Sequence, residues 1–307
     1  MRRIFARALA VAVLAGLAAC SAGKNADQAP PLHVLLIPAD GGTESGTLAD
    51  YKPVFQAVGQ TAGIDFDLKV AQSYGAVVEA LCNGTADVAF VGPVTYLQAR
   101  ERGCAELLAV AVENGKSEYY AGIFARKDGP VHAISDLRSR SLALGDVNST
   151  SSFVIPVAML VEAKLDPVTE LGALRLTGSH ANSLAALLEK RVDAAALSFD
   201  SFEKAVREGV PGVENVQVVA RSEPIPYPPL VMNNKLPGAL KTKLRQAFAD
   251  VAKAPSIRPE MIRGYGGKQV DGYDAAFPAE RFDDAARKMA LVSDELKGEI
   301  LKKSAER

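Results

Sequence analysis

The sequence of 307 residues contains no tryptophan, and aromatic residues make up only 6% of it. Its 35 lysines and arginines nearly balance 36 aspartates and glutamates, and no run rich in basic residues stands out. Nucleic acid is therefore not an expected partner, because nucleic-acid-binding domains present a strongly basic face. With so few aromatic rings, each tyrosine at a predicted binding position carries more information than usual.

Signatures of catalysis and of metal binding are also missing. The sequence has no Gly-x-Ser-x-Gly turn for a nucleophilic serine, and no grouping of His, Cys and carboxylates with the spacing of a metal site. Ser149, His180 and Asp200 could form a hydrolytic triad, but serines clustered at a helix start also serve anion binding without chemistry. The sequence thus predicts a protein that is not an enzyme and needs neither metal nor cofactor.

Only one apolar run stands apart from the globular pattern, and it lies at the N-terminus. Residues 8–19 follow three arginines and are too short to span a bilayer, which is typical of a secretory signal. The run ends in Leu-Ala-Ala-Cys-Ser, similar to a bacterial lipobox. We expect residues 1–19 to be removed, Cys20 to carry lipid, and residues 20–31 to form a flexible tether. An ordinary cleaved signal peptide is the alternative to this membrane-anchored, extracytoplasmic lipoprotein.

Two cysteines remain once Cys20 is assigned to the lipid. Cys82 and Cys104 form an even pair in an oxidising compartment, so the sequence predicts a disulfide between them. Two buried free thiols, or a site for a soft metalloid, are the alternatives.

Short apolar runs alternate with segments of helical spacing along the rest of the chain. This alternation predicts an α/β fold with a mainly parallel sheet covered on both faces. The pattern begins again near residue 134, so we expect two αβ lobes of roughly one hundred residues each. The expected strands are 32–38, 64–70, 86–91, 107–112, 119–125, 141–144, 174–176, 192–197, 216–219 and 230–232, and the main helices are 51–62, 74–81, 94–102, 157–163, 180–189, 237–252 and 279–302.

One connection in this pattern has an unusual composition. Residues 145–156 join a predicted strand to a predicted helix and contain four consecutive hydroxyl residues, 149–152. Backbone N–H groups at a helix start have no partners within the helix, and Ser and Thr hydroxyls there add further donors for an oxyanion. Simple capping by Asn148 or Ser149 is the alternative.

Three segments, taken in order, resemble one known family. They are Ser-Tyr-Gly-Ala-Val-Val-Glu-Ala-Leu followed by Asp-Val-Ala-Phe-Val-Gly-Pro-Val-Thr-Tyr within residues 73–96, Tyr-Tyr-Ala-Gly-Ile-Phe-Ala-Arg-Lys-Asp and Ile-Ser-Asp-Leu within 119–137, and the hydroxyl-rich stretch 145–156. With the signal segment they resemble the phosphate/phosphite/phosphonate-binding (PhnD-like) substrate-binding proteins of ABC importers.

The resemblance implies a type II periplasmic-binding-protein fold that holds a small oxyanion between two closing lobes. Residues 32–123 and 226–307 would form lobe 1, and residues 124–225 lobe 2. The protein would act as a monomer and deliver its ligand to an ABC permease and ATPase complex.

Carried over position by position, the resemblance also implies a ligand-binding set. The hydroxyls of the loop would hold the phosphoryl oxygens, and two tyrosines, a histidine and a carboxylate would complete the site. The set comprises Tyr74, Tyr119, Ser149, Thr150, Ser151, His180 and Asp200.

Besides Ser149, three members of this set also have purely structural interpretations. Tyr74 could be a core or rim tyrosine, and His180 a structural histidine at a helix start. Asp200 could cap the following helix. Tyr120 competes with Tyr119, since neighbouring strand residues point to opposite faces.

Two departures from the family pattern bear on the ligand. Ser152 stands where the family usually has glycine, so the loop could be tighter or carry one extra donor. Family members that bind aminophosphonates have a second carboxylate after an Ile-Pro turn, whereas Ile225-Pro226 here is followed by none. An unpaired buried ammonium costs several kcal/mol. We therefore expect phosphite, methylphosphonate or phosphate rather than 2-aminoethylphosphonate, bound without a matched Lys or Arg.

A second function remains open at this point. The same fold could serve a sensor lipoprotein that presents an oxyanion, or arsenite held by a cysteine, to a membrane sensor kinase. The state of Cys82 and Cys104 discriminates between the two functions, because a disulfide cannot ligate a metalloid.

Overall fold

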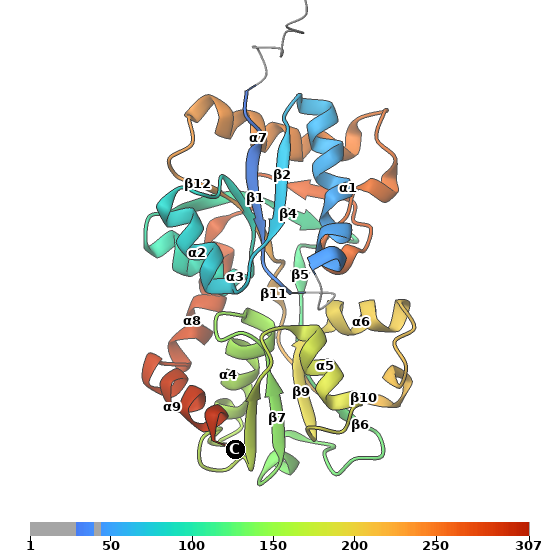
Figure 1. The fold of residues 1–307 in the computed structure, drawn as a ribbon, viewed down its shortest axis with the longest axis vertical. Coiled ribbons are helices and arrows are strands. Elements are labelled where there is room, and N and C mark those ends of the chain that lie inside the picture. The colour runs from blue at the N-terminus through green and yellow to red at the C-terminus, as the bar shows by residue number, and fades with distance from the viewer. Residues whose placement is uncertain (1–28, 40–43, 307) are drawn as a thin grey trace, which may run out of the picture. The chain divides into compact units, whose positions relative to one another are not determined.

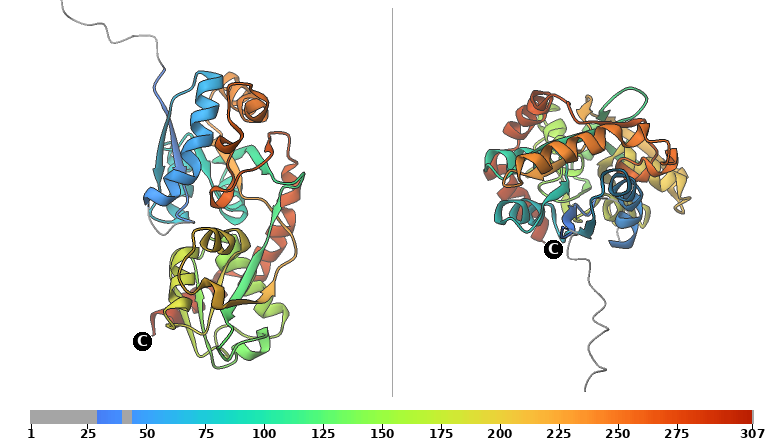
Figure 2. Two further views of the ribbon diagram at one scale, coloured as in Figure 1. Left: turned by 90° about the vertical axis from the view of Figure 1, so that its right-hand side faces the viewer. Right: turned by 90° about the horizontal axis from the view of Figure 1, so that it is seen from above.

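A computed structural model describes residues 29–39 and 44–306. The predicted signal segment, Cys20 and most of the predicted tether lie outside the described residues. Within the described part of the chain, no helix is both long enough and apolar enough to cross a membrane. The elements form two αβ lobes, each built on its own sheet (Figures 1 and 2).

The first lobe is built on a six-stranded sheet of order β13-β4-β12-β3-β1-β2. Helix α1 packs against α7, and α2 packs against α3, so two helix pairs cover the sheet. The strands are β1 (Leu32–Leu36), β2 (Phe66–Val70), β3 (Val88–Phe90), β4 (Ala105–Val112), β12 (Pro229–Asn233) and β13 (Gly272–Asp274), and the helices are α1 (Glu44–Ala62), α2 (Tyr74–Asn83), α3 (Pro93–Glu101) and α7 (Gly238–Asp250).

The second lobe is built on a five-stranded sheet of order β10-β6-β9-β7-β8. Its central strand, Ala194–Ser198, is buried along its whole length, as expected for a sheet covered on both faces. The strands are β6 (Ala121–Arg126), β7 (Ser141–Leu144), β8 (Ala173–Leu176), β9 (Ala194–Ser198) and β10 (Val216–Arg221), and the helices are α4 (Ile155–Glu162), α5 (His180–Leu188) and α6 (Phe199–Arg207).

Both sheets are mixed, so the prediction of a mainly parallel sheet is wrong. Strand β12 lies between β3 and β4 and runs antiparallel to both, and β6 lies antiparallel between β9 and β10. Each of these two strands follows directly on a crossing from the other lobe. Such a strand enters the sheet from the end opposite to its neighbours, which a local βαβ pattern does not reveal.

A short two-stranded ladder carries the chain between the lobes. Strand β5 (Glu118–Tyr119) pairs antiparallel with β11 (Ile225–Pro226), with Tyr119 opposite Ile225. The predicted single strand 119–125 is therefore divided at Tyr120, after which β6 enters the second sheet. This ladder is the hinge of the two lobes.

The C-terminal segment connects the two lobes once more. The predicted helix 279–302 is divided into a 3₁₀ turn (Ala279–Phe282), α8 (Asp283–Leu291) and α9 (Asp294–Ala305), with Ser293 capping α9. Phe282 belongs to the core of the first lobe, whereas Val292 and Ile300 belong to the core of the second. Helix α9, which the expected boundary places in lobe 1 with the rest of 226–307, packs on β8 of the second sheet.

Cys82 and Cys104 are joined by a disulfide, with 4.7 Å between their Cα atoms. The bond connects the last turn of α2 to the residue before β4 and closes a loop of sequence separation 22. In this bonded state neither sulfur is a thiolate ligand.

Candidate functional site

The hydroxyl-rich loop follows β7 and continues into α4 through a π-helical turn, Thr150–Val154. Ser149 caps this turn, since its Oγ accepts from the Ser152 backbone N–H at 3.3 Å and from the Ser152 hydroxyl at 2.7 Å. A Cβ on Gly145 would lie 2.0 Å from Ser152 Oγ, so a glycine is required there. The Ser152 hydroxyl is thus hydrogen-bonded within the loop, so the structure of the loop explains the fourth consecutive hydroxyl residue without any ligand contact.

Thr150 and Ser151 connect this loop to the hinge and to the first lobe. Thr150 Oγ1 accepts from the backbone N–H of Val94, in the first turn of α3, at 2.9 Å. Burial raises the pKa of the Tyr119 phenol, in β5, and the neighbouring hydroxyls of Ser151 and Thr150 oppose this shift, so the phenol stays protonated. Tyr120 faces elsewhere and packs under the guanidinium of Arg221, 3.6 Å from its ring centroid. Of the two neighbouring tyrosines, Tyr119 is the one that meets the loop.

The first-lobe helices also contact the loop just before its hydroxyls. The backbone N–H of Tyr74, the first residue of α2, donates to Asp146 Oδ2 at 3.3 Å. Thr95 donates to the Asn148 carbonyl at 3.1 Å, and Gln98 donates to the Asn148 side chain at 2.9 Å. The starts of α2 and α3 therefore both face the loop of the second lobe. The Tyr74 ring is buried with the first-lobe core, which agrees with its structural interpretation as well.

His180 lies at the start of α5, where Ser179 is the capping residue. Its Nδ1 accepts from the backbone N–H of Ser198 at 3.0 Å, so the proton of the neutral ring lies on Nε2. Burial lowers the pKa of His180 to about 3, which keeps the ring neutral at pH 7. His180 thus has a structural role, and it retains one N–H donor at Nε2.

Asp200 lies in the first turn of α6, but the cap of that helix is Ser198. The Asp200 carboxylate is buried and pairs with Lys268 Nζ at 2.5 Å. The same ammonium lies 2.6 Å from Glu113 Oε2. Burial raises the pKa of Asp200, although the ammonium of Lys268 opposes this shift. The capping interpretation of Asp200 is therefore wrong, and its partner is a cation of this chain.

A further aromatic residue, Tyr265, lies between these groups. The hydroxyl of Tyr265 lies 3.2 Å from those of Ser198 and Ser201, and its ring is 6.2 Å from that of His180. The Tyr265 ring is also 5.9 Å from that of Tyr119. Tyr265 thereby connects the hinge and loop side of the site to the side of α5 and α6.

Sequence reasoning missed Tyr265 and Lys268, which come from one loop far along the chain. Sequence reasoning also missed Tyr227, which lies between β11 and β12. Its hydroxyl accepts from the Tyr265 backbone N–H at 3.1 Å. The scarcity of aromatic residues was the only signal for the two tyrosines. Nothing local distinguishes Lys268 from other lysines.

The arrangement can surround a small oxyanion with donors that are mostly neutral. All seven predicted binding residues are buried, at 3% exposure or less. Five of them are polar residues that are uncommon in a protein core: two serines, a threonine, a histidine and an aspartate. Hydroxyls, an imidazole N–H and the first N–H groups of several helices are the groups that bind phosphoryl oxygens. Ser149, Thr150 and Ser151 lie together beside Tyr119, and His180 is connected to them through Ser198 and Tyr265, whereas Asp200 is paired with Lys268.

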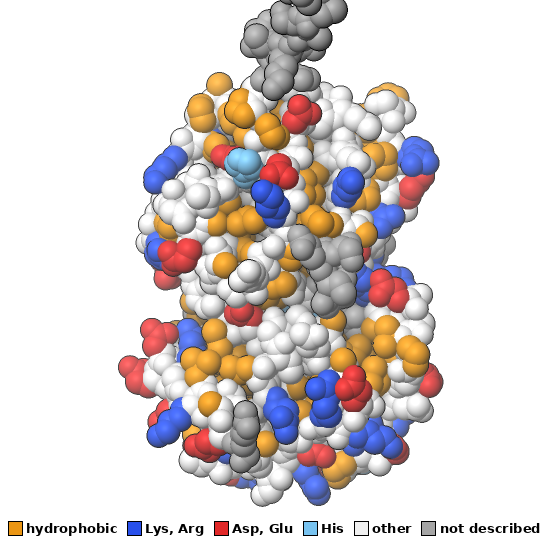
Figure 3. Space-filling view, in the orientation of Figure 1, with side chains coloured by type: hydrophobic (Ala, Val, Ile, Leu, Met, Phe, Trp, Pro, Cys, Tyr) orange, Lys and Arg blue, Asp and Glu red, His pale blue; other side chains and the backbone are white. Residues whose placement is uncertain are grey.

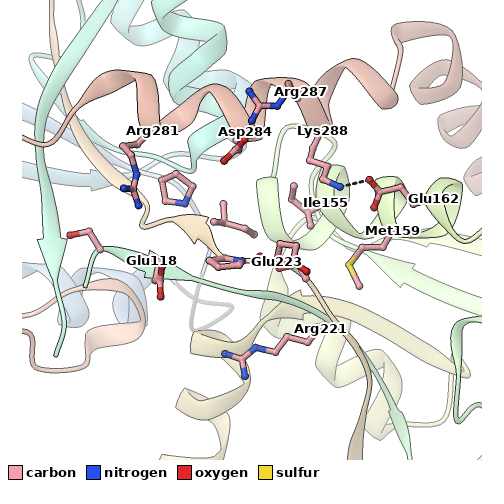
Figure 4. A pocket seen from close by; sticks show the side chains of 16 residues that line it. Glu118, Ile155, Met159, Glu162, Arg221, Glu223, Arg281, Asp284, Arg287 and Lys288 are labelled. Atoms are coloured by element: carbon pink, nitrogen blue, oxygen red, sulfur yellow. Dashed lines mark hydrogen bonds and ion pairs between the residues drawn. The ribbon is translucent and has the colours of Figure 1, made fainter. Parts of the chain in front are cut away.

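Three cavities are lined mainly by residues outside this cluster. One, of about 570 Å³, is lined by Glu118, Arg221, Met159 and Lys288 among others (Figure 4). None of the seven predicted residues is among the described residues that line it. Another, of about 370 Å³, lies between α5 and α6 and has His180 in its wall. On the face shown in Figure 3, charged side chains of both signs are interspersed.

Comparison with known families decides what kind of protein carries this site. Residues 42–280 match the family described as ABC transporter, phosphonate, periplasmic substrate-binding protein. The chain belongs to this family. The resemblance predicted from three short segments is thereby confirmed.

Relatives of this substrate-binding protein differ in what their names say they bind. The chain is 24% identical over 218 residues to the phosphonates-binding periplasmic protein of Escherichia coli, a match covering 69% of this chain and 64% of that one. It is 26% identical over 270 residues to the phosphate-import protein PhnD of Mycolicibacterium smegmatis, covering 82% and 84%. The match to the first relative thus spans slightly less than two thirds of its length.

The fold of the substrate-binding protein is also shared with solved structures. A binding protein component of an ABC phosphonate transporter from Pseudomonas aeruginosa superposes with a TM-score of 0.72 at 22% identity, over 89% of this chain and 97% of the other. The predicted two-lobe, type II periplasmic-binding-protein fold is confirmed. Members of the family bind substrates for transport outside the cytoplasmic membrane rather than convert them.

Proposed function

We propose that this protein captures a phosphorus oxyanion between its two lobes and delivers it to an ABC permease and ATPase complex. The observation that carries the proposal is the contact of Thr150 and Ser151 with Tyr119 and with the start of α3. This contact brings together hydroxyl groups of the second lobe, a tyrosine of the hinge and the start of a helix of the first lobe. An oxyanion held there would interact with both lobes and would favour their closure.

The ligands that fit best are phosphite, methylphosphonate and phosphate. Each offers several oxygens to hydroxyl and N–H donors and carries no amine. The carboxylate of Asp200, a member of the predicted binding set, is already paired with Lys268. The names of the relatives include both phosphonates and phosphate, so they support the class of ligand and not one member of it.

The membrane anchor forms part of the same proposal. We infer that residues 1–19 are cleaved, that lipid on Cys20 holds the protein at the membrane surface, and that it works there as a monomer. The lipobox-like sequence around Cys20 supports this. Mass spectrometry of the membrane-extracted protein should find a diacylated N-terminal cysteine, whereas a Cys20→Ser variant should be recovered without lipid.

Transport is favoured over the sensing alternative by two observations. The matched family consists of transporter components, and Cys82 and Cys104 are bonded to each other rather than available to arsenite. No catalytic step is proposed, because Ser149 is hydrogen-bonded to Ser152 and not to His180.

Calorimetric titration tests the proposal directly. The mature protein is titrated with phosphite, methylphosphonate, ethylphosphonate, phosphate, 2-aminoethylphosphonate, sulfate and arsenite, and small-angle scattering is recorded at saturation. At least one amine-free phosphorus oxyanion should bind and reduce the radius of gyration. The proposal fails if none of them binds, or if only sulfate or arsenite does.

A further inference from the structure

Three charged side chains meet beside the proposed anion site. Lys268 Nζ lies 2.5 Å from Asp200 Oδ1 and 2.6 Å from Glu113 Oε2, and 5.8 Å from the Tyr227 ring centroid. The side chains of Asp200 and Lys268 are 4% and 16% exposed, and that of Glu113 is 27% exposed. A pair buried to this degree is weakly screened by solvent, so its charges act strongly on their neighbours.

The pair is close enough to influence a bound anion. The Lys268 ammonium lies 5.8 Å from the centroid of the Tyr227 ring, and this ring is 6.1 Å from that of Tyr119, which belongs to the predicted binding set. Asp200 also lies two residues after Ser198, whose backbone N–H holds His180. A doubly charged oxyanion in this cluster would therefore face the carboxylate of Asp200 across a poorly solvated space. Like charges so placed repel each other unless a cation intervenes.

We propose that Lys268 determines the charge specificity of the site: its ammonium neutralises Asp200, so that the site accepts anions without an amine and rejects aminoalkyl phosphonates. This inference rests on the proposed function. In the absence of Lys268, Asp200 repels the oxyanion and becomes available to an ammonium group on the ligand. Lys268 thus occupies, from within the chain, the place that a ligand amine would take.

If Lys268 only stabilised the contact between the lobes, its substitution would weaken all ligands alike. Lys268 follows the Tyr265–Gly267 turn, which contributes to the first-lobe core, while Asp200 belongs to α6 of the second lobe, so their pair also joins the lobes. A second pair, Lys204 of α6 with Asp50 of α1, joins them too. Asp50→Asn/Lys204→Met therefore makes a matched control. It removes an ion pair between the lobes and leaves Asp200 neutralised.

The test compares ethylphosphonate with 2-aminoethylphosphonate, which differ by one terminal ammonium group. Calorimetry at pH 7.5 should show that the wild-type protein prefers ethylphosphonate at least tenfold. In Lys268→Met the preference should shift at least tenfold towards the amine, mainly through weaker binding of ethylphosphonate. In Asp200→Asn/Lys268→Met most of the gain of amine binding should disappear, because only the more exposed carboxylate of Glu113 is left. In the Asp50/Lys204 control both affinities should change by the same factor.

Asp200→Asn alone supplies a test that does not depend on the folding of Lys268→Met. It leaves Lys268 paired with Glu113, so ethylphosphonate should bind at least as tightly as to the wild-type protein, and the amine should not gain. The inference is overturned if Lys268→Met weakens both ligands equally, if the amine gain persists without Asp200, or if Asp200→Asn loses ethylphosphonate. A wild-type protein that binds none of the amine-free phosphorus oxyanions would instead refute the proposed function itself.

Discussion

The two lobes meet through two contact regions of different chemistry. On the side of the hydroxyl loop the contacts are hydrogen bonds, from Val94 to Thr150 and from Thr95 and Gln98 to Asn148. On the side of α6 they include two ion pairs, Lys204 with Asp50 and Lys268 with Asp200, beside the hydrogen bonds of Tyr265 with Ser198 and Ser201.

The difference between the two regions indicates a division of roles. Hydrogen bonds between neutral groups depend on distance and direction, so the loop region can test the shape of a ligand and the positions of its oxygens. Ion pairs act over longer distances and depend on charge, so the α6 region can test the charge that a ligand brings. Four predictions examine this division, from the largest expected effect to the smallest.

Lys204→Met should have the largest effect on stability. The substitution leaves the buried carboxylate of Asp50 without its partner, which typically costs about 3–5 kcal/mol. Urea unfolding should show this loss, and Asp50→Asn/Lys204→Met should recover most of it. Lys253→Met, which removes an exposed pair with Asp250, should cost no more than about 0.5 kcal/mol. Equal effects at the buried and exposed pairs would contradict an ionic contact of this strength.

Thr150→Val should weaken binding of the best oxyanion by about 1–3 kcal/mol, because it removes one hydroxyl and leaves polar groups without a partner. Calorimetry measures the loss. Thr150→Ser keeps the hydroxyl and should stay close to the wild-type affinity. An unchanged affinity in the valine variant would remove Thr150 from the proposed site.

His180 should make the folded protein less stable in mild acid. Burial lowers its pKa to about 3, whereas the unfolded chain takes up a proton near the ordinary value of 6.5. Its contribution is therefore fully present above pH 6.5 and is lost as the pH falls towards 3, at up to about 1.4 kcal/mol per pH unit.

The difference between the free energies of unfolding at pH 7 and pH 5 measures this contribution. It should shrink in His180→Gln and stay unchanged in His132→Gln, whose ring is exposed and bonded to Gln217. A wild-type protein equally stable at both pH values would show that His180 is not held neutral by burial.

Ser152→Ala should have the smallest effect, a loss of about 1 kcal/mol in stability with ligand affinity kept within twofold. Its hydroxyl donates to Ser149 inside the loop, so the loss is that of one buried hydrogen bond. Thermal unfolding and calorimetry on the same preparation separate the two quantities. A large loss of affinity would place Ser152 among the ligand donors.

Local sequence patterns predicted much of the framework. Apolar runs bounded by Gly and Pro located the strands, and the hydroxyl-rich loop was placed between β7 and α4 as observed. The antiparallel insertion of β6 and β12 could not be predicted this way, because it depends on where the chain crosses between lobes. The break before α9 was readable in principle, since Ser293 is followed by two acidic residues, as at many helix starts.

The candidate site also has one part that the sequence predicts and another that it does not. Ser149, Thr150 and Ser151 are consecutive, so composition alone reveals them, and the family resemblance supplied Tyr119, His180 and Asp200. Lys268 contacts residues 68 and 155 positions earlier in the chain, Asp200 and Glu113. Nothing in a single sequence connects such distant residues. Only the folded structure shows that the carboxylate of Asp200 already has a partner.

The last helix has a practical consequence for observing this protein at work. Because β1 belongs to the first sheet and α9 packs on the second, the two ends of the described chain are attached to different lobes. A fluorescent donor near Leu32 and an acceptor beyond α9 would therefore report the rotation of one lobe against the other in single molecules. Opening rates could be followed in real time, with no label in the hinge or at the candidate site.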